Sequence, residues 1–327
     1  MNRRIVHRAL GRSIGTLLLV VASAREPVAE QRPTFTSEAE LVAINVVVTD
    51  KQGRTVTNLT EGAFQVSEDH RPQRITQFTK DPLPLGIAVA LDTSASMRGD
   101  RFGYAREAIS RLIDRLNPQD DVALYGFNNW PYQITSWTSS HSAVITALID
   151  EQPMARGGST ALFEAVRVGL NLLDSAAARR RALLVISDGN EELPGDQWLP
   201  GGMSGHTLWR RINASARDRL PKYTEVVRRS EGLVYAVGIS DPRGRGEPLD
   251  EETLKALADP TGGFVTTVHA NADIPGAVER VLNDLRDQYL IGFVPTHPAD
   301  GKFHKLKVTV RGCDCRARAR AGFVHSR

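Results

Sequence analysis

Cysteine is nearly absent from the chain, with only Cys313 and Cys315 among 327 residues. This pair alone offers too few ligands for a zinc site. The two cysteines stand one residue apart in a strand-like stretch, where the Cα atoms of alternate residues are about 7 Å apart, and an unstrained disulfide does not span that distance. A tight turn would bring them closer. A turn disulfide, an intermolecular disulfide and free thiols are therefore all open.

Common catalytic and nucleotide-binding motifs are also missing. The sequence has no G-x-S-x-G elbow, Walker loop or G-x-G-x-x-G motif between a strand and a helix. Its histidines are scattered and form no pattern with Ser94 or Ser96. Among its eight histidines are His141, His206, His269, His297 and His304. We expect most of them to lie on the surface, so a general base is missing and catalysis is disfavoured.

The apolar run near the N-terminus, over 14–22, is too short to span a membrane, because a spanning helix needs about 20 apolar residues. Four arginines precede this run, and Ala22-Ser23-Ala24 follows it. We interpret residues 1–24 as a secretory signal with an A-x-A cleavage site. The chain is therefore expected to be exported, to the periplasm or the extracellular space, with no stable membrane anchor after cleavage.

Excess positive charge is confined to that N-terminal segment. The formal net charge is +3, from 41 basic and 38 acidic residues. Removal of the four arginines leaves 37 basic residues against 38 acidic ones, a net charge of −1. Nothing in the remaining chain indicates a nucleic-acid partner.

Both ends of the chain are rich in short β-like segments. Residues 25–40 are polar, with several prolines and glutamates, which is typical of a flexible leader. Short β-rich runs separated by turn residues follow over 41–80, and strand character returns over 288–327, where apolar and charged residues alternate. The first set of strands is too small to be stable alone. We therefore expect one small antiparallel β-sandwich-like domain built from both chain ends.

The central segment, residues 85–287, alternates between strand-like and helix-like patterns. Continuous apolar runs over 86–91 and 182–186 are typical of strands covered on both faces. The strands expected over 122–127 and 132–137 are too close in sequence to be parallel. The segment thus predicts an α/β fold, with a doubly wound, mostly parallel sheet and one antiparallel edge strand. Such sheets bind ligands at the carboxyl ends of their strands.

Oxygen-bearing side chains gather where these strands are expected to end. Asp92, Ser94 and Ser96 alternate just past the first buried strand, and Asp188 follows the second. Thr160 comes after two glycines at the start of an expected helix. Alternate residues of an extended loop aim their side chains to one side. Five oxygens from three loops would suit a hard cation such as Mg²⁺, Mn²⁺ or Ca²⁺.

This three-part pattern resembles the von Willebrand factor type A (VWA) domain with its metal ion-dependent adhesion site, over roughly residues 85–287. The resemblance implies one bound ion. It implies that Ser94 and Ser96 bind the ion directly, that Thr160 binds it directly or through water, and that Asp92 and Asp188 often act through water.

The whole chain also resembles secreted bacterial VWFA-related proteins. This likeness rests on residues 46–50, on Leu59-Thr60 with Phe64, and on residues 288–293. Ala95 departs from the glycine that is usual between the two serines. If this position required a positive φ, alanine would strain the loop and weaken the site.

Neutral hydroxyl ligands would leave the ion electrophilic, with one coordination position for a carboxylate from outside. We therefore expect a protein partner that presents an Asp or Glu side chain to the ion. The surrounding rim would set specificity, and it includes the long connection expected over 191–221. The candidate rim residues are Asn129, Trp130, Trp198 and Trp209.

Two other functions are weighed against this metal-dependent adhesion. One is a metal-assisted or serine hydrolase, which the absence of a general base disfavours. The other is a structural or scaffold protein of the cell envelope whose metal site is vestigial. The presence of all five ligand types argues against a vestigial site.

Overall fold

The computed structural model describes residues 41–80, 83–155, 159–178, 180–192, 205–241, 243 and 248–325. Within the helix that begins at Gly205, side chains are described from residue 216 onward. The predicted signal over 1–24 and the predicted leader over 25–40 lie outside the described residues. Among the residues that are described, no helix is both long enough and apolar enough to cross a membrane.

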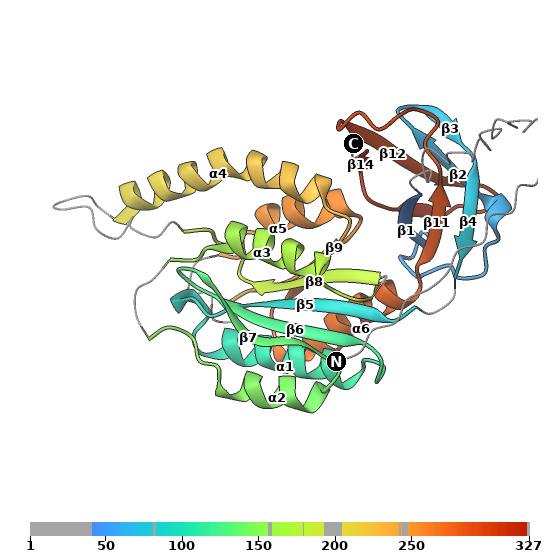
Figure 1. The fold of residues 1–327 in the computed structure, drawn as a ribbon. Helices are drawn as coiled ribbons and strands as arrows, with labels where there is room; N and C mark the ends of the chain where they lie inside the picture. The colour runs from blue at the N-terminus through green and yellow to red at the C-terminus, as the bar shows by residue number, and fades with distance from the viewer. Residues whose placement is uncertain are drawn as a thin grey trace, which may run out of the picture. The chain divides into compact units, whose positions relative to one another are not determined.

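A six-stranded sheet forms the central part of the fold, with the strand order β10-β9-β8-β5-β6-β7 (Figure 1). Its strands are β5 (Leu85–Asp92), β6 (Asp121–Phe127), β7 (Pro131–Thr138), β8 (Arg180–Ser187), β9 (Leu233–Ile239) and β10 (Val265–Val268). All neighbouring strands are parallel except β7, which runs antiparallel to β6. Every residue of β5 and β9 is buried, which explains their continuous apolar sequences.

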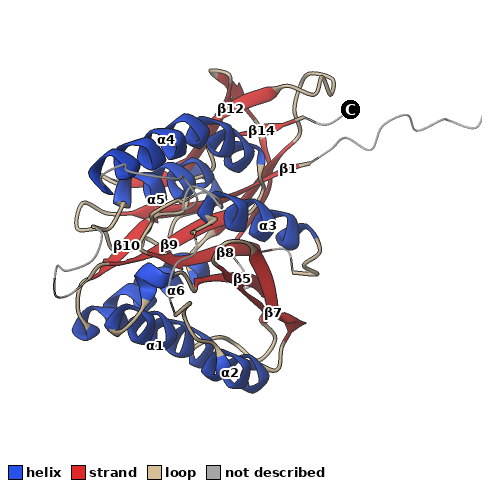
Figure 2. Cartoon of the chain, turned by 90° about the vertical axis from the view of Figure 1, so that its left-hand side faces the viewer, coloured by secondary structure: helices blue, strands red, loops and turns tan. Residues whose placement is uncertain are grey.

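Helices cover both faces of this sheet (Figure 2). Helices α1, α2 and α6 pack on one face, and α3, α4 and α5 pack on the other. Their bounds are α1 (Asp100–Asp114), α2 (His141–Asp150), α3 (Leu162–Asp174), α4 (Gly205–Arg229), α5 (Glu251–Ala258) and α6 (Ile274–Arg286). The predicted doubly wound α/β arrangement, with one antiparallel edge strand, is confirmed.

Strands from both chain ends pair in two further antiparallel sheets. One has the order β13-β1-β11-β4 and the other the order β14-β12-β2-β3. Their bounds are β1 (Val42–Thr49), β2 (Phe64–Glu68), β3 (Arg71–Gln73), β4 (Ile75–Thr79), β11 (Tyr289–Phe293), β12 (Phe303–Val310), β13 (Arg316–Arg318) and β14 (Gly322–Val324). The rings of Phe64, Tyr289 and Phe293 lie in the shared core, so neither chain end completes these sheets alone.

Helix α6 continues into β11 through two residues that tie the helical and β parts together. Gln288 Nε2 donates to the hydroxyl of Tyr235 at 3.2 Å, and Thr55 Oγ1 donates to Asp287 Oδ2 at 2.6 Å. Arg318 of β13 also bonds to the carboxylate of a residue in α6, Asp284. The division into segments 41–80, 85–287 and 288–327 stays a prediction.

Three details differ from the sequence-based expectations or complete them. Residues 316–324 form two strands in different sheets, β13 and β14, separated by a turn. The expected connection over 191–221 instead contains the start of α4, which continues past Pro221. A proline within a helix removes a backbone donor, so the sequence around Pro221 does not predict a helix there. Cys313 and Cys315 form a disulfide across a turn, with their Cα atoms 5.3 Å apart.

Candidate metal site

The parallel pairing of β5 with β8 brings two predicted ligands to the same sheet edge. Leu91 pairs with Ile186, so Asp92 and Asp188 both emerge at the carboxyl ends of adjacent strands. Asp92 is fully buried, and its Oδ2 accepts a hydrogen bond from Ser187 Oγ at 2.6 Å. Asp92 is therefore held by the neighbouring strand as well as by its own.

The loop after β5 turns both serine hydroxyls toward each other. Asp92 Oδ1 accepts a hydrogen bond from Ser94 N at 2.8 Å, and a short turn of 3-10 helix over Ala95–Met97 follows. Ser94 Oγ and Ser96 Oγ are 3.0 Å apart. Two oxygens at right angles around an ion, each at about 2.1 Å, are also about 3.0 Å apart. The serine pair thus fits neighbouring positions in an octahedral magnesium shell.

Ala95 does not strain this loop. Among the described non-glycine residues, only Asp69 and His70 have a positive φ. Position 95 therefore has no need for glycine, and the expected cost of alanine there is absent.

Arg101, in the first turn of α1, contacts two of the candidate ligands, and sequence reasoning missed it. Its guanidinium donates to Asp188 Oδ2 at 2.8 Å and to the backbone oxygen of Ser96 at 3.0 Å. Both charged side chains are buried, with 3% of Arg101 and 0% of Asp188 exposed. Because the arginine occupies one oxygen of Asp188, this aspartate is suited to reach an ion through water.

The electrostatics of the group follow from burial of two acids. Burial, together with the nearby charge of Asp188, raises the pKa of Asp92. Burial likewise raises the pKa of Asp188, although the Arg101 guanidinium and the Ser96 hydroxyl act in the opposite direction. Two buried carboxylates against one guanidinium leave negative charge that a cation would offset.

Thr160 is placed by its main chain beside the loop that follows Asp188. Its backbone oxygen accepts a hydrogen bond from Glu192 N at 2.9 Å, and the residue itself is 3% exposed. The adjacent Ser159 Oγ donates to Asn129 Oδ1 at 3.0 Å. Side-chain bonds and charge link the other four predicted ligands to one another, whereas the backbone bond of Thr160 is to Glu192, which is not one of them. That these five residues ligate an ion stays a prediction.

Glu191 fixes the start of α3 next to Thr160. Its Oε2 accepts a hydrogen bond from Phe163 N at 2.9 Å, and its Oε1 accepts one from Arg219 at 2.8 Å. Burial raises the pKa of Glu191 to about 7, although the Phe163 amide and Arg219 oppose this. The loop that carries Thr160 is therefore anchored by a buried acid.

The predicted rim residues lie in different settings. Trp130, in the turn between β6 and β7, is 65% exposed. Asn129 in the same turn uses its side-chain oxygen to hold Ser159, so it supports the Thr160 loop. Trp198 lies outside the described residues, and Trp209 lies in α4 where only the backbone is described.

The central segment matches a known family. Residues 87–191 match the model of the von Willebrand factor type A domain. The chain contains a VWA domain. The match begins in β5 and ends at Glu191, so it spans Asp92, Ser94, Ser96, Thr160 and Asp188.

Two curated relatives share this part of the chain. A UPF0353 protein of Mycolicibacterium vanbaalenii is 27% identical over 213 residues, which cover 62% of this chain and 59% of that protein. Inter-alpha-trypsin inhibitor heavy chain H2 of Sus scrofa is 22% identical over 218 residues, which cover 63% of this chain and 20% of that protein. The chain therefore spans less than two thirds of the length of either relative.

Solved structures show the same kind of likeness. The crystal structure of BatB, a conserved hypothetical protein from Bacteroides thetaiotaomicron, has 19% identity and a TM-score of 0.45, covering 61% of this chain and 98% of its own. The von Willebrand factor domain of the type V pili tip protein Mfa5 from Porphyromonas gingivalis has 13% identity and a TM-score of 0.46, covering 62% of this chain and 94% of its own.

Proposed function

We propose that the chain is an exported protein-binding module in which one Mg²⁺-type ion, or Mn²⁺ or Ca²⁺, bridges the VWA domain to an acidic side chain of a partner. The observation that carries this proposal is the pair of serine hydroxyls, 3.0 Å apart, set against two buried aspartates. Ser94 and Ser96 would hold the ion directly, with Thr160 beside them. Asp92 and Asp188 would orient its water ligands.

The charge of the group favours an ion that still attracts an acid. Hydroxyl ligands are neutral, and the Asp188 charge is shared with Arg101. The bound ion would therefore keep much of its positive charge, which an incoming Asp or Glu carboxylate neutralises. Trp130 is exposed, and the preceding residue in the same turn, Asn129, bonds to Ser159 in the loop that carries Thr160. An exposed tryptophan near the ion would supply apolar contact area to the same partner.

Names of similar proteins support an interaction role at or outside the cell surface. One similar structure belongs to a pilus tip protein, and one relative is an inter-alpha-trypsin inhibitor heavy chain. We accordingly propose a location in the periplasm or outside the cell. No stable membrane anchor and no nucleic-acid partner form part of the proposal.

Catalysis is the less favoured alternative. A serine nucleophile is usually activated by a neighbouring histidine. The Ser94 and Ser96 hydroxyls instead bond to each other, and they also bond to Asp92 and Asp188 respectively. A purely structural protein with a vestigial metal site is the other alternative, and failure to bind any divalent ion would favour it.

Chelation tests the proposed bridge directly. The immobilised chain is incubated with an envelope fraction in Mg²⁺, then washed with EDTA, and then returned to Mg²⁺ with the eluted proteins. We expect the partner to leave in EDTA and to rebind once Mg²⁺ is restored, because the ion is the bridge. Asp92→Asn serves as the site control and should retain little partner in either buffer. Retention that survives EDTA and the Asp92→Asn change would refute the proposed mode of binding.

A further inference from the structure

A second group of metal-ligating side chains lies among the antiparallel β strands and shares no residue with the candidate metal site. It consists of Glu68 at the end of β2, His304 in β12 and His297 in the connection between β11 and β12. One ligand atom from each residue lies within 4.8 Å of the others. Glu68 is 2% exposed and His304 is 9% exposed. A carboxylate and two imidazoles are thus gathered at a largely buried point.

Strand pairing accounts for this convergence across the chain. Glu68 of β2 pairs with Leu306 of β12, and His304 precedes Leu306 by two residues, so its side chain emerges on the same face. The backbone oxygen of Lys305 also accepts a hydrogen bond from Asp69 N at 2.9 Å. The register that forms the sheet therefore fixes two of the three side chains.

The two imidazoles are already oriented as metal ligands. Glu68 Oε1 is 2.7 Å from His297 Nε2 and 3.5 Å from His304 Nδ1. Ligand atoms around a tetrahedral zinc ion, at about 2.1 Å from the metal, are about 3.4 Å apart. The two separations from Glu68 bracket this value, and all three ligand atoms lie within 4.8 Å of one another, so an ion would draw these side chains together by small movements.

The outer nitrogens of both rings have partners of the kind found in metal sites. His297 Nδ1 is 2.9 Å from the backbone oxygen of Pro298, and His304 Nε2 is 3.1 Å from Asp300 Oδ1. A carbonyl or carboxylate behind a ligating histidine fixes the ring and its tautomer. The rings also stack, with centroids 4.2 Å apart, so both nitrogens that face Glu68 are held in place.

We propose that Glu68, His297 and His304 bind one divalent transition-metal ion, with Zn²⁺ the best fit. Mixed imidazole and carboxylate ligands suit zinc and its neighbours in the first transition row, whereas Mg²⁺ and Ca²⁺ prefer all-oxygen sites. Asp69 Oδ2, 2.9 Å from His304 Nδ1, offers one further oxygen nearby. The proposal does not depend on the function proposed for the VWA domain, which uses none of these residues.

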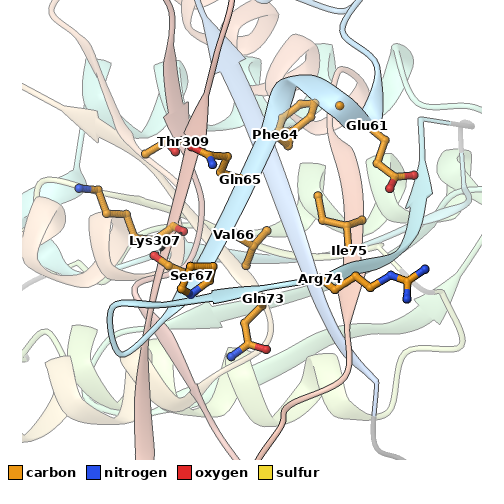
Figure 3. A pocket seen from close by; sticks show the side chains of 12 residues that line it. Glu61, Phe64, Gln65, Val66, Ser67, Gln73, Arg74, Ile75, Lys307 and Thr309 are labelled. Carbon is orange, nitrogen blue, oxygen red and sulfur yellow. Dashed lines mark hydrogen bonds between the residues drawn. The ribbon is translucent and has the colours of Figure 1, made fainter.

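With three protein ligands, the fourth position of a tetrahedral ion would be taken by Asp69 or by water. A cavity of about 310 Å³ borders the three ligands and is also lined by Arg71, Gln73 and Thr296. Gln73 Nε2 donates to Glu68 Oε2 at 3.0 Å, and Gln73 also lines the adjoining pocket of about 530 Å³ drawn in Figure 3. The ion would join strands from the two chain ends and so stabilise the β sheets that they form together.

Zinc titration of the full chain tests the proposal. The protein is stripped with chelator, kept under non-reducing conditions so that Cys313 and Cys315 stay in their disulfide, and saturated with Mg²⁺. Calorimetry should show one tight Zn²⁺ site per chain. Removal of an outer partner usually weakens metal binding about 10- to 100-fold, so we expect that range for Asp300→Asn and a larger loss for His304→Ala.

Matched variants separate ligand loss from unfolding and from the VWA site. His269→Ala removes an exposed histidine and should leave the zinc affinity unchanged. Asp92→Asn should also leave it unchanged, even where partner binding fails. Glu68→Gln preserves the shape of the side chain. The far-UV circular dichroism spectrum of this variant should therefore match that of the wild type. Zn²⁺ should raise the Tm of the wild type by several degrees more than that of Glu68→Gln.

Substitution with Co²⁺ gives a readout that does not depend on stability. The wild-type chain should develop the intense visible absorption of tetrahedral cobalt, and His304→Ala should not. The proposal is overturned if the wild type binds no stoichiometric Zn²⁺ or Co²⁺. It is equally overturned if a folded His304→Ala or Glu68→Gln variant binds zinc as tightly as the wild type.

Discussion

Asp92→Asn is expected to lower the affinity of the chain for Mg²⁺ and Mn²⁺ by about 10- to 100-fold, the loss typical when a partner that orients metal ligands is removed. Asp92 is fully buried and accepts hydrogen bonds from Ser94 N and Ser187 Oγ, so the charge of its carboxylate lies next to the loop that carries the serine pair. Asparagine preserves the shape but removes that charge. Isothermal titration of each ion into the two proteins measures the difference.

Asp120 provides a matched control at the other end of the same strands. It is 3% exposed, and its carboxylate accepts hydrogen bonds from Leu85 N at 3.0 Å and from Asn117 N at 2.9 Å. Because it lies at the amino edge of the sheet, Asp120→Asn should leave the metal affinity unchanged even if it lowers stability. Equal losses in the two variants would mean that the Asp92 effect reflects folding and not ion binding.

Arg101→Met should destabilise the metal-free chain by about 3–5 kcal/mol, because it leaves the Asp188 carboxylate buried without its partner. The two groups are 2.8 Å apart and almost completely inaccessible. Urea unfolding in EDTA measures this loss. Adding Mg²⁺ should then stabilise the variant more than the wild type, because the ion and the guanidinium offset the same buried negative charge.

Arg111→Met is the control for this experiment. Arg111 lies on the same helix, and its pair with Glu107 is about half exposed, at 50% and 42%. An exposed pair contributes about 0–1 kcal/mol, so this variant should unfold at nearly the wild-type urea concentration. If Mg²⁺ stabilised Arg101→Met no more than the wild type, the ion would not share a site with Asp188.

Local pattern was enough to predict the sheet and the place where the candidate ligands meet. The continuous apolar run in β5 and the one in β8 required burial on both faces, and parallel pairing then required Asp92 and Asp188 to emerge together. The short connection from β6 to β7 required the antiparallel edge. These inferences succeed because each depends on a few adjacent residues.

Interactions between distant residues were beyond such reasoning. Arg101 is part of an amphipathic helix in sequence, and nothing local indicates that it is buried against a residue 87 positions away. Helix α4 was missed for another reason. It contains Pro221, and a proline within a helix is unusual.

The histidines show the same limit more clearly. Most histidines were expected to lie on the surface, yet His297 and His304 stack on each other and face Glu68, 229 positions from His297. The sequence held one signal of this cluster. His297 and His304 are seven residues apart and flank a turn, and the strands next to that turn were expected to pair with the N-terminal segment. The pairing register of β2 with β12, which brings Glu68 to them, could not be read from the sequence.

Anomalous diffraction from a crystal of the full chain grown with Mn²⁺ tests the central claim most directly. We predict one strong manganese peak at the carboxyl edge of the central sheet, within about 2.5 Å of the hydroxyl oxygens of Ser94 and Ser96 and with Thr160 beside it. A map at saturating Mn²⁺ with no peak there, or with Thr160 turned away from an ion bound elsewhere, would contradict metal-bridged recognition by this domain.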